Sequence, residues 1–221
     1  MADYILYSYF RSSTSYRVRI AMNLKSLPYE LRGVHLLKNG GEQHHPDYKL
    51  LNPQGEVPTL VHQGRAIGQS FAILEYLDDL HLQPQLFPPD PYERARIRQF
   101  CENINSFLHP LANLKVLQKL EKDHGFTQDQ KTAWIHHWYS KGLEVLELIV
   151  QKNKGKFCFG DSITAADVFL IPCLFTAQRF GMDLSAYPKC VAIEKLCLEI
   201  EAFKKAHPYR QPDTPEAERI P

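Results

Sequence analysis

The apolar positions in the first third of the chain switch between the spacing of strands and that of helices. Tyr4 to Ser8 is a short run of β-forming residues, and the apolar residues within Tyr16 to Lys25 recur at nearly helical intervals. A second extended run, Tyr29 to His35, follows. These three segments predict a β-α-β unit whose two strands are parallel. Gly40-Gly41 and His45-Pro46 then indicate a loop.

The next apolar segment predicts a hairpin followed by a helix. Val57 to Val61 and Arg65 to Ile67 flank a Gln63-Gly64 turn, which is typical of a β-hairpin. Ser70 is a suitable N-cap for a helix with an apolar face that includes Leu74. Residues 1–83 are therefore predicted to form a thioredoxin-like α+β domain with a mixed four-stranded sheet.

The remainder of the chain has a different periodicity. Residues 84–91 contain the proline-rich stretch Leu86 to Pro91, which is unsuited to a helix or strand interior and predicts a linker. Beyond it, residues 92–221 are predicted to form an all-helical domain. Its expected helices are one through Leu114 that bends at Pro110, one along Trp134 to Ile149, one over Thr164 to Phe180, and one over Val191 to Ala206. Thr164 and Asp167 have capping-box spacing, which we assign to folding.

Composition narrows the range of partners. The formal net charge of +1 provides no bulk field for nucleic acid or an anionic membrane, so we expect neither as a partner. The N-terminal residues do not resemble a secretory signal, and no apolar stretch has the length of a membrane span. The five cysteines include no CxxC pair and predict free thiols in a reducing compartment, the cytosol.

Three hydroxyl side chains, Ser12, Ser13 and Thr14, stand just before the first predicted helix. The first N–H groups of a helix lack intrahelical partners and favour an anion, and a hydroxyl donor stabilises a thiolate and lowers the pKa of its thiol. The turn is therefore a candidate thiolate site. An ordinary N-cap role explains the same residues, and the composition of the turn alone favours that role.

Two further segments could bind a charged peptide. A cis bond at Val57-Pro58 would leave backbone groups available to pair with a ligand as an added strand, although most X-Pro bonds are trans. Gln69 and Ser70 place an amide and a hydroxyl at the start of the next helix, where a carboxylate or a simple N-cap would fit. The adjacent histidine pairs lack acidic or cysteine partners at ligand spacing, so we expect no metal site.

The residues from Ser12 to Ala21 closely resemble the S-S-C-x-W-R-V-R-I-A signature of the zeta-class glutathione transferases, also called maleylacetoacetate isomerases. The similarity extends over nearly the whole chain and includes the Gln69-Ser70 pair, Asn113-Leu114 and Arg179-Phe180, and the tail from His207 to Pro215. The resemblance implies a glutathione transferase fold, glutathione as the cofactor, and a homodimer. It also implies a small dicarboxylic or electrophilic substrate, whose pocket the helical domain shapes.

The resemblance also implies a role for each matching residue. Ser12 would be the hydroxyl that stabilises the glutathione thiolate, with Ser13 and Thr14 in the same catalytic turn. The expected glutathione-binding residues are Ser12, Gln43, Val57 ahead of a cis Pro58, Gln69, Ser70, His109 and Asn113. Arg179 would bind the carboxylates of the second substrate. The implied reaction is the conversion of maleylacetoacetate to fumarylacetoacetate by reversible thiolate addition.

Three residues depart from the pattern of the family. Thr14 stands in place of a cysteine, Tyr16 in place of a tryptophan, and His109 in place of a glutamine. Two other hypotheses therefore accompany isomerisation. The protein would be a general glutathione transferase or peroxidase for electrophiles such as α-halo acids if the cysteine takes part chemically, because a threonine hydroxyl remains protonated at neutral pH. The third hypothesis is a non-enzymatic module that binds glutathione or a protein.

Overall fold

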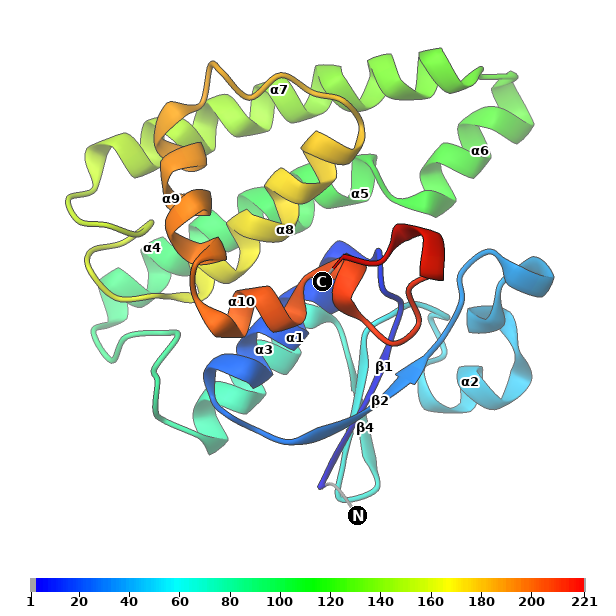
Figure 1. Cartoon of the computed structure of the whole chain (residues 1–221), viewed down its shortest axis with the longest axis horizontal. Helices are drawn as coiled ribbons and strands as arrows, with labels where there is room; N and C mark the ends of the chain where they lie inside the picture. Colours follow the sequence, from blue (N-terminus) through cyan, green and yellow to red (C-terminus); the bar gives the residue numbers. More distant parts are fainter. Residues whose placement is uncertain (1–2, 221) are drawn as a thin grey trace. The chain divides into compact units, whose positions relative to one another are not determined.

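The computed structural model describes residues 3–220, which divide into two compact units (Figure 1). The first comprises Met1–Gln85 and Leu198–Pro221, and the second comprises Leu86–Cys197. No helix within residues 3–220 has the length and apolar character needed to cross a membrane.

The first unit is built on a four-stranded mixed sheet in the order β2-β1-β3-β4. Its strands are β1 (Tyr4–Ser8), β2 (Tyr29–Gly33), β3 (Thr59–His62) and β4 (Arg65–Gly68). β1 is parallel to β2, with Leu6 opposite Leu31, and antiparallel to β3, with Leu6 opposite Leu60. Thr59 to His62 then pairs antiparallel with Arg65 to Gly68. The β-α-β unit, the hairpin and the mixed sheet predicted from the sequence are confirmed.

Helices cover both faces of this sheet. α1 (Ser13–Leu24) and α3 (Ser70–Leu80) lie on one side and α2 (Pro46–Leu51) on the other (Figure 1). The sequence predicts a loop here, but residues 46–51 form a helix that begins at Pro46. A proline is tolerated at this position because the first N–H groups of a helix have no intrahelical partner, so no hydrogen bond is lost. Tyr48 is the buried residue of this short helix, and it packs with Tyr9, Phe10 and other residues in one apolar cluster.

A fully buried arginine connects the start of α1 to the end of the chain. Arg19 Nε donates to the Ala206 carbonyl at 3.0 Å, and Nη1 donates to Ser8 Oγ at 3.0 Å and to the Tyr9 carbonyl at 3.4 Å. Nη2 donates to the Phe10 carbonyl at 3.0 Å. Burial lowers the pKa of Arg19 to about 10, so the guanidinium is still charged at neutral pH.

The end of the chain differs from the sequence prediction. Instead of one helix over Val191 to Ala206, the structure has α9 (Pro188–Leu198) and α10 (Glu201–Ala206), because Ile200 adopts an extended conformation between them. α10 packs against α1, so residues after Leu198 belong with the first unit and not with the predicted helical domain 92–221. The apolar spacing of this region fits a helix but does not show which neighbour its buried side, at Phe203 and Ala206, packs against.

The tail beyond α10 folds back on itself and on the sheet. Gln211 Nε2 donates to the carbonyls of Lys205 and His207, each at 2.8 Å. Asp213 Oδ2 accepts the Phe10 N–H at 2.8 Å. Burial, with smaller contributions from Arg210 and Arg19, lowers the pKa of His207 to about 4, so its ring is neutral at pH 7. The tail is therefore an ordered part of the first unit that fixes the end of β1.

The second unit is helical. Its elements are α4 (Pro91–Glu102), a π-helical segment η3 (Asn103–Leu108), α5 (His109–Leu111), α6 (Leu114–His124), α7 (Gln128–Lys152), α8 (Ala165–Arg179) and most of α9. The predicted bend at Pro110 occurs as a change to π geometry one turn earlier, because proline lacks an N–H and excludes the carbonyl four residues before it. Leu86 and Phe87, predicted to lie in a linker, are buried.

The predicted capping box at the start of α8 is present. Asp167 Oδ2 accepts the Thr164 N–H at 2.8 Å and the Thr164 hydroxyl at 3.1 Å, and Oδ1 accepts the Cys158 N–H at 2.8 Å. Burial raises the pKa of Asp167, and these hydrogen bonds to the carboxylate oppose that shift. The structure confirms the assignment of this pair to folding.

The contacts of Arg19 predict a large loss of stability for Arg19→Lys. Lysine keeps the charge but lacks the planar set of donors. Because the buried carbonyls of Phe10 and Ala206 would lose the guanidinium donors that they have in the wild type, we expect the free energy of unfolding to fall by about 3 kcal/mol. Urea denaturation measures the loss, and Arg32→Lys on the exposed side of β2 is the matched control, with no measurable loss expected. Equal stability of the two variants would contradict this role of Arg19.

Candidate functional site

The turn between β1 and α1 places Ser12 at the start of the helix. Ser12 has an extended backbone (φ −68°, ψ 118°) and caps α1, since its Oγ accepts the Ser15 N–H at 3.2 Å. The N-cap interpretation of this turn is therefore correct. Ser12, Ser13 and Thr14 are all partly exposed, and the first turn of α1 contains no acidic residue. The same serine is therefore both a helix cap and an accessible hydroxyl.

The hydroxyl groups of this turn form a chain with a fixed direction. Ser12 Oγ lies 2.8 Å from Thr14 Oγ1, and Thr14 Oγ1 donates to the Val57 carbonyl at 2.9 Å. A carbonyl only accepts, so the single hydroxyl proton of Thr14 is directed to Val57. Ser12 must then donate to Thr14. The proton of Ser12 is thus held by a neighbouring hydroxyl, which could yield it to a stronger acceptor.

The peptide bond between Val57 and Pro58 is cis, and both residues are buried. The preceding loop is held through one carbonyl: Glu56 O accepts from Tyr48 Oη at 2.6 Å and from Asn52 Nδ2 at 2.9 Å. Burial raises the pKa of Tyr48 to about 12, so its hydroxyl keeps its proton for this bond. No hydrogen bond joins the Val57 N–H to another of residues 3–220. This amide can therefore pair with an extended peptide ligand.

The start of α3 combines a positive-φ residue with a buried hydroxyl. Gln69 has φ 65°, and its Nε2 donates to Gln54 Oε1 at 2.8 Å. Ser70, the first residue of α3, is 3% exposed, and its Oγ accepts from Arg17 Nη1 at 3.1 Å. No side chain caps the first turn of α3 within the described chain, and that turn contains no acidic residue. The helix start is suited to an anion.

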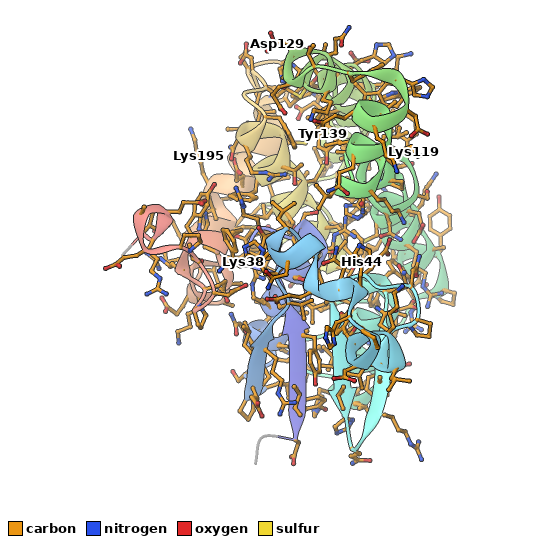
Figure 2. All side chains as sticks on the ribbon, turned by 90° about the vertical axis from the view of Figure 1, so that its right-hand side faces the viewer. Lys38, His44, Lys119, Asp129, Tyr139 and Lys195 are labelled. Atoms are coloured by element: carbon orange, nitrogen blue, oxygen red, sulfur yellow. The ribbon has the colours of Figure 1, made fainter. Side chains whose placement is uncertain are left out.

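The remaining candidate in this unit, Gln43, is buried in the connection between β2 and α2. Its Nε2 donates to the Leu36 carbonyl at 3.3 Å and lies 3.1 Å from His44 Nε2. Figure 2 labels His44 and Lys38 on this connection. Gln43 therefore supports its own loop, and its expected contact with glutathione stays a prediction.

The other three candidates belong to the second unit. Asn113 caps α6, since its Oδ1 accepts the Lys115 N–H at 3.1 Å, and its Nδ2 lies 3.3 Å from His109 Nε2. Arg179 is exposed at the end of α8, with its guanidinium 4.6 Å from the centre of the Phe180 ring. The structure brings His109 and Asn113 together, and the roles of all three toward ligands stay predictions.

Three residues that shape the site are not predicted from the sequence: Arg17 behind Ser70, Tyr48 behind the Val57 loop, and Asp213 at the Phe10 amide. One signal was available for Arg17, because it stands beside the largely apolar run Val18 to Met22 of a predicted helix, and an arginine that is buried there needs partners. Among residues 3–220, no group of three or more His, Cys, Asp or Glu side chains is arranged to hold a metal ion.

The donor set of the first unit suits a peptide with a thiol and a free carboxylate. Ser12 provides a hydroxyl donor at a helix start, Val57 provides an amide at the edge of the cis bond, and α3 begins without a capping group. This chemistry matches the ligand that the sequence resemblance implies.

Comparisons with known proteins support the same family. The profile of the glutathione S-transferase N-terminal domain matches residues 11–80, and that of the glutathione S-transferase C-terminal domain matches residues 105–211. Maleylacetoacetate isomerase of Rattus norvegicus is 45% identical over 211 residues, which cover 96% of this chain and 95% of that protein.

Solved structures are similar over the same length. The holo structure of maleyl pyruvate isomerase, described as a bacterial glutathione S-transferase of the zeta class, is 38% identical with a TM-score of 0.92, covering 96% of this chain and 100% of that chain. Maleylacetoacetate isomerase of Methylobacterium extorquens AM1, solved with bound malonate and glutathione, is 36% identical with a TM-score of 0.91, covering 96% and 99%. These matches confirm the fold predicted from the sequence. The chain belongs to the glutathione S-transferase family, in its zeta or maleylacetoacetate isomerase class.

Proposed function

We propose that the protein catalyses the glutathione-dependent cis-trans isomerisation of maleylacetoacetate to fumarylacetoacetate or of a closely related maleyl acid. The observation that supports this most directly is the hydroxyl chain from Ser12 through Thr14 to Val57 at the start of α1. It presents a donor for a thiolate beside the backbone edge at which a thiol peptide would bind. Relatives named for this reaction support the choice of substrate.

The residues of the first unit are suited to hold glutathione, as the family resemblance implies. Val57 would pair with the cysteinyl backbone, and Gln69 and Ser70 would hold the γ-glutamyl end at the start of α3. When bound, glutathione supplies a thiol sulfur that adds reversibly to a conjugated cis double bond and leaves after rotation about the resulting single bond. Ser12 would turn its proton from Thr14 toward the sulfur, stabilise the thiolate and lower the pKa of the thiol.

The second unit would bind the dicarboxylic substrate. Arg179 is exposed, permanently charged and able to hold a carboxylate through two N–H donors. We assign it to the substrate carboxylates, and we assign His109 and Asn113 to glutathione binding, as the family resemblance implies.

We also propose a cytosolic homodimer. All five cysteines are free and buried, as suits a reducing compartment, and the homodimer follows the family resemblance. Light scattering of the purified protein would measure its mass in solution.

The proposed reaction predicts that the purified protein isomerises maleylacetone only when glutathione is present. Ser12→Ala should lower kcat/KM by about 10²-fold, since the thiolate loses its main donor. Ser185→Ala, at an exposed serine between α8 and α9, is the control and should retain full activity. The change in absorbance as the cis substrate becomes the trans product follows the rate.

The general transferase is the alternative that a specific observation favours, because Thr14 replaces a cysteine. Conjugation of glutathione to an α-halo acid, without isomerisation of maleylacetone, would overturn the isomerase proposal in its favour.

The hydroxyl chain from Ser12 through Thr14 to Val57 predicts the effect of Thr14→Cys. Sulfur accepts hydrogen bonds weakly, so the variant would compete less for the Ser12 proton and leave it to the bound thiolate. We expect kcat for maleylacetone to rise about fivefold, the equivalent of one hydrogen bond of about 1 kcal/mol. The KM for glutathione should rise as well, because the bond from Thr14 to Val57 weakens. Unchanged or reduced kcat in Thr14→Cys would show that Thr14 does not compete for this proton.

A further inference from the structure

Arg17 is a buried arginine of α1 that donates a hydrogen bond to the first residue of α3. Its side chain is 1% exposed, and its Nη1 donates to Ser70 Oγ at 3.1 Å, a link across 53 residues of sequence. Ser70 is itself buried, at 3% exposure, and is the first residue of α3. Arg17 therefore touches the start of α3 from the protein interior and is too deeply buried to reach a ligand in solvent.

The direction of this hydrogen bond fixes what Ser70 can do. A guanidinium only donates, so the Ser70 oxygen accepts from Arg17 and the Ser70 proton is left to point away from it. A hydroxyl held in this way is a donor toward whatever lies at the start of α3. Its orientation is then set by the protein before any ligand arrives, which reduces the ordering cost of binding.

The start of α3 differs from the starts of four other helices, although α2, α5 and α10 also begin without a side-chain cap hydrogen bond. α1, α4, α6 and α7 begin with a side-chain oxygen that accepts a first-turn N–H, from Ser12, Asp90, Asn113 and Thr127. α3 has no such side-chain bond within residues 3–220 and no acidic residue in its first turn. The positive helix end and the Ser70 hydroxyl that Arg17 orients therefore lie at the same place, and both favour an anion there.

We propose that Arg17 is a positioning residue for glutathione binding, which orients the Ser70 hydroxyl toward the carboxylate of the γ-glutamyl group. This inference rests on the proposed function. Arg19, two residues further along α1, gives its hydrogen bonds to carbonyls and to Ser8 and has a structural role. Of these two arginines of α1, Arg19 thus stabilises the fold and Arg17 positions the Ser70 hydroxyl.

A double-mutant cycle measured by calorimetric titration with glutathione tests the proposal. Arg17→Gln and Ser70→Ala should each raise the Kd for glutathione about tenfold, the loss of a charge-assisted hydrogen bond. The double variant should bind no more weakly than either single variant, because Arg17 acts through Ser70. Arg32→Gln, on the exposed side of β2, is the matched control and should bind as the wild type does.

Cysteinylglycine, which lacks the γ-glutamyl group, provides a second measurement. Neither variant should change the Kd for cysteinylglycine. A general loss of structure would instead weaken the binding of glutathione and of cysteinylglycine to the same extent. An Arg17→Gln protein that binds glutathione as the wild type does, or losses that multiply in the double variant, would overturn the proposal. If Arg17→Gln does not fold, Ser70→Ala decides: unchanged glutathione binding, or equal losses for the two ligands, would overturn it.

The same titrations separate this inference from the proposed function. A wild-type protein that does not bind glutathione would overturn both the proposed function and the role of Arg17. A wild-type protein that binds glutathione and isomerises maleylacetone, together with an Arg17→Gln variant of unchanged affinity, would remove only the role of Arg17.

Discussion

The first unit depends on the buried guanidinium of Arg19. A charged group without contact to water must satisfy its donors, and Arg19 does so with Ser8 and with the carbonyls of Tyr9, Phe10 and Ala206. Three of these acceptors belong to the end of β1 and the turn that follows, and the fourth ends α10. One side chain thus fixes the turn and also fastens the last segment of the chain to α1.

The positions of Ser12 and Thr14 follow from that fixed turn. With the backbone of Tyr9 and Phe10 held by Arg19 and Asp213, Ser12 is placed as the cap of α1, and Thr14 is placed within reach of the Val57 carbonyl. The Val57 carbonyl can only accept a hydrogen bond, so Thr14 donates to Val57 and Ser12 donates to Thr14. Arg17 repeats the principle at α3, where a buried charge holds a hydroxyl in one orientation. Hydrogen bonds therefore fix a serine side chain at the start of both helices.

The sequence predicted those parts of the fold that local pattern controls. The strands, the hairpin, α1, α3, α8 and the capping box at Thr164 follow from periodicity and cap chemistry. α2 was missed because six residues are too few for a periodic signal, and α10 was joined to α9 because its partner, α1, lies far away in sequence. The candidate hydroxyls were found from their residue types. The partners of Arg17, Tyr48 and Asp213 were not, because each bond depends on tertiary placement.

If the Ser12 turn stabilises a thiolate, the pKa of the glutathione thiol must fall when glutathione binds. Ultraviolet absorbance of the thiolate, followed as the glutathione-saturated protein is titrated with base, measures this pKa. We expect a pKa well below the value of about 8.5 that is usual for a free thiol, and a return toward that value in Ser12→Ala. A thiol that has the same pKa in the wild-type complex as in free glutathione would show that the turn does not stabilise the thiolate.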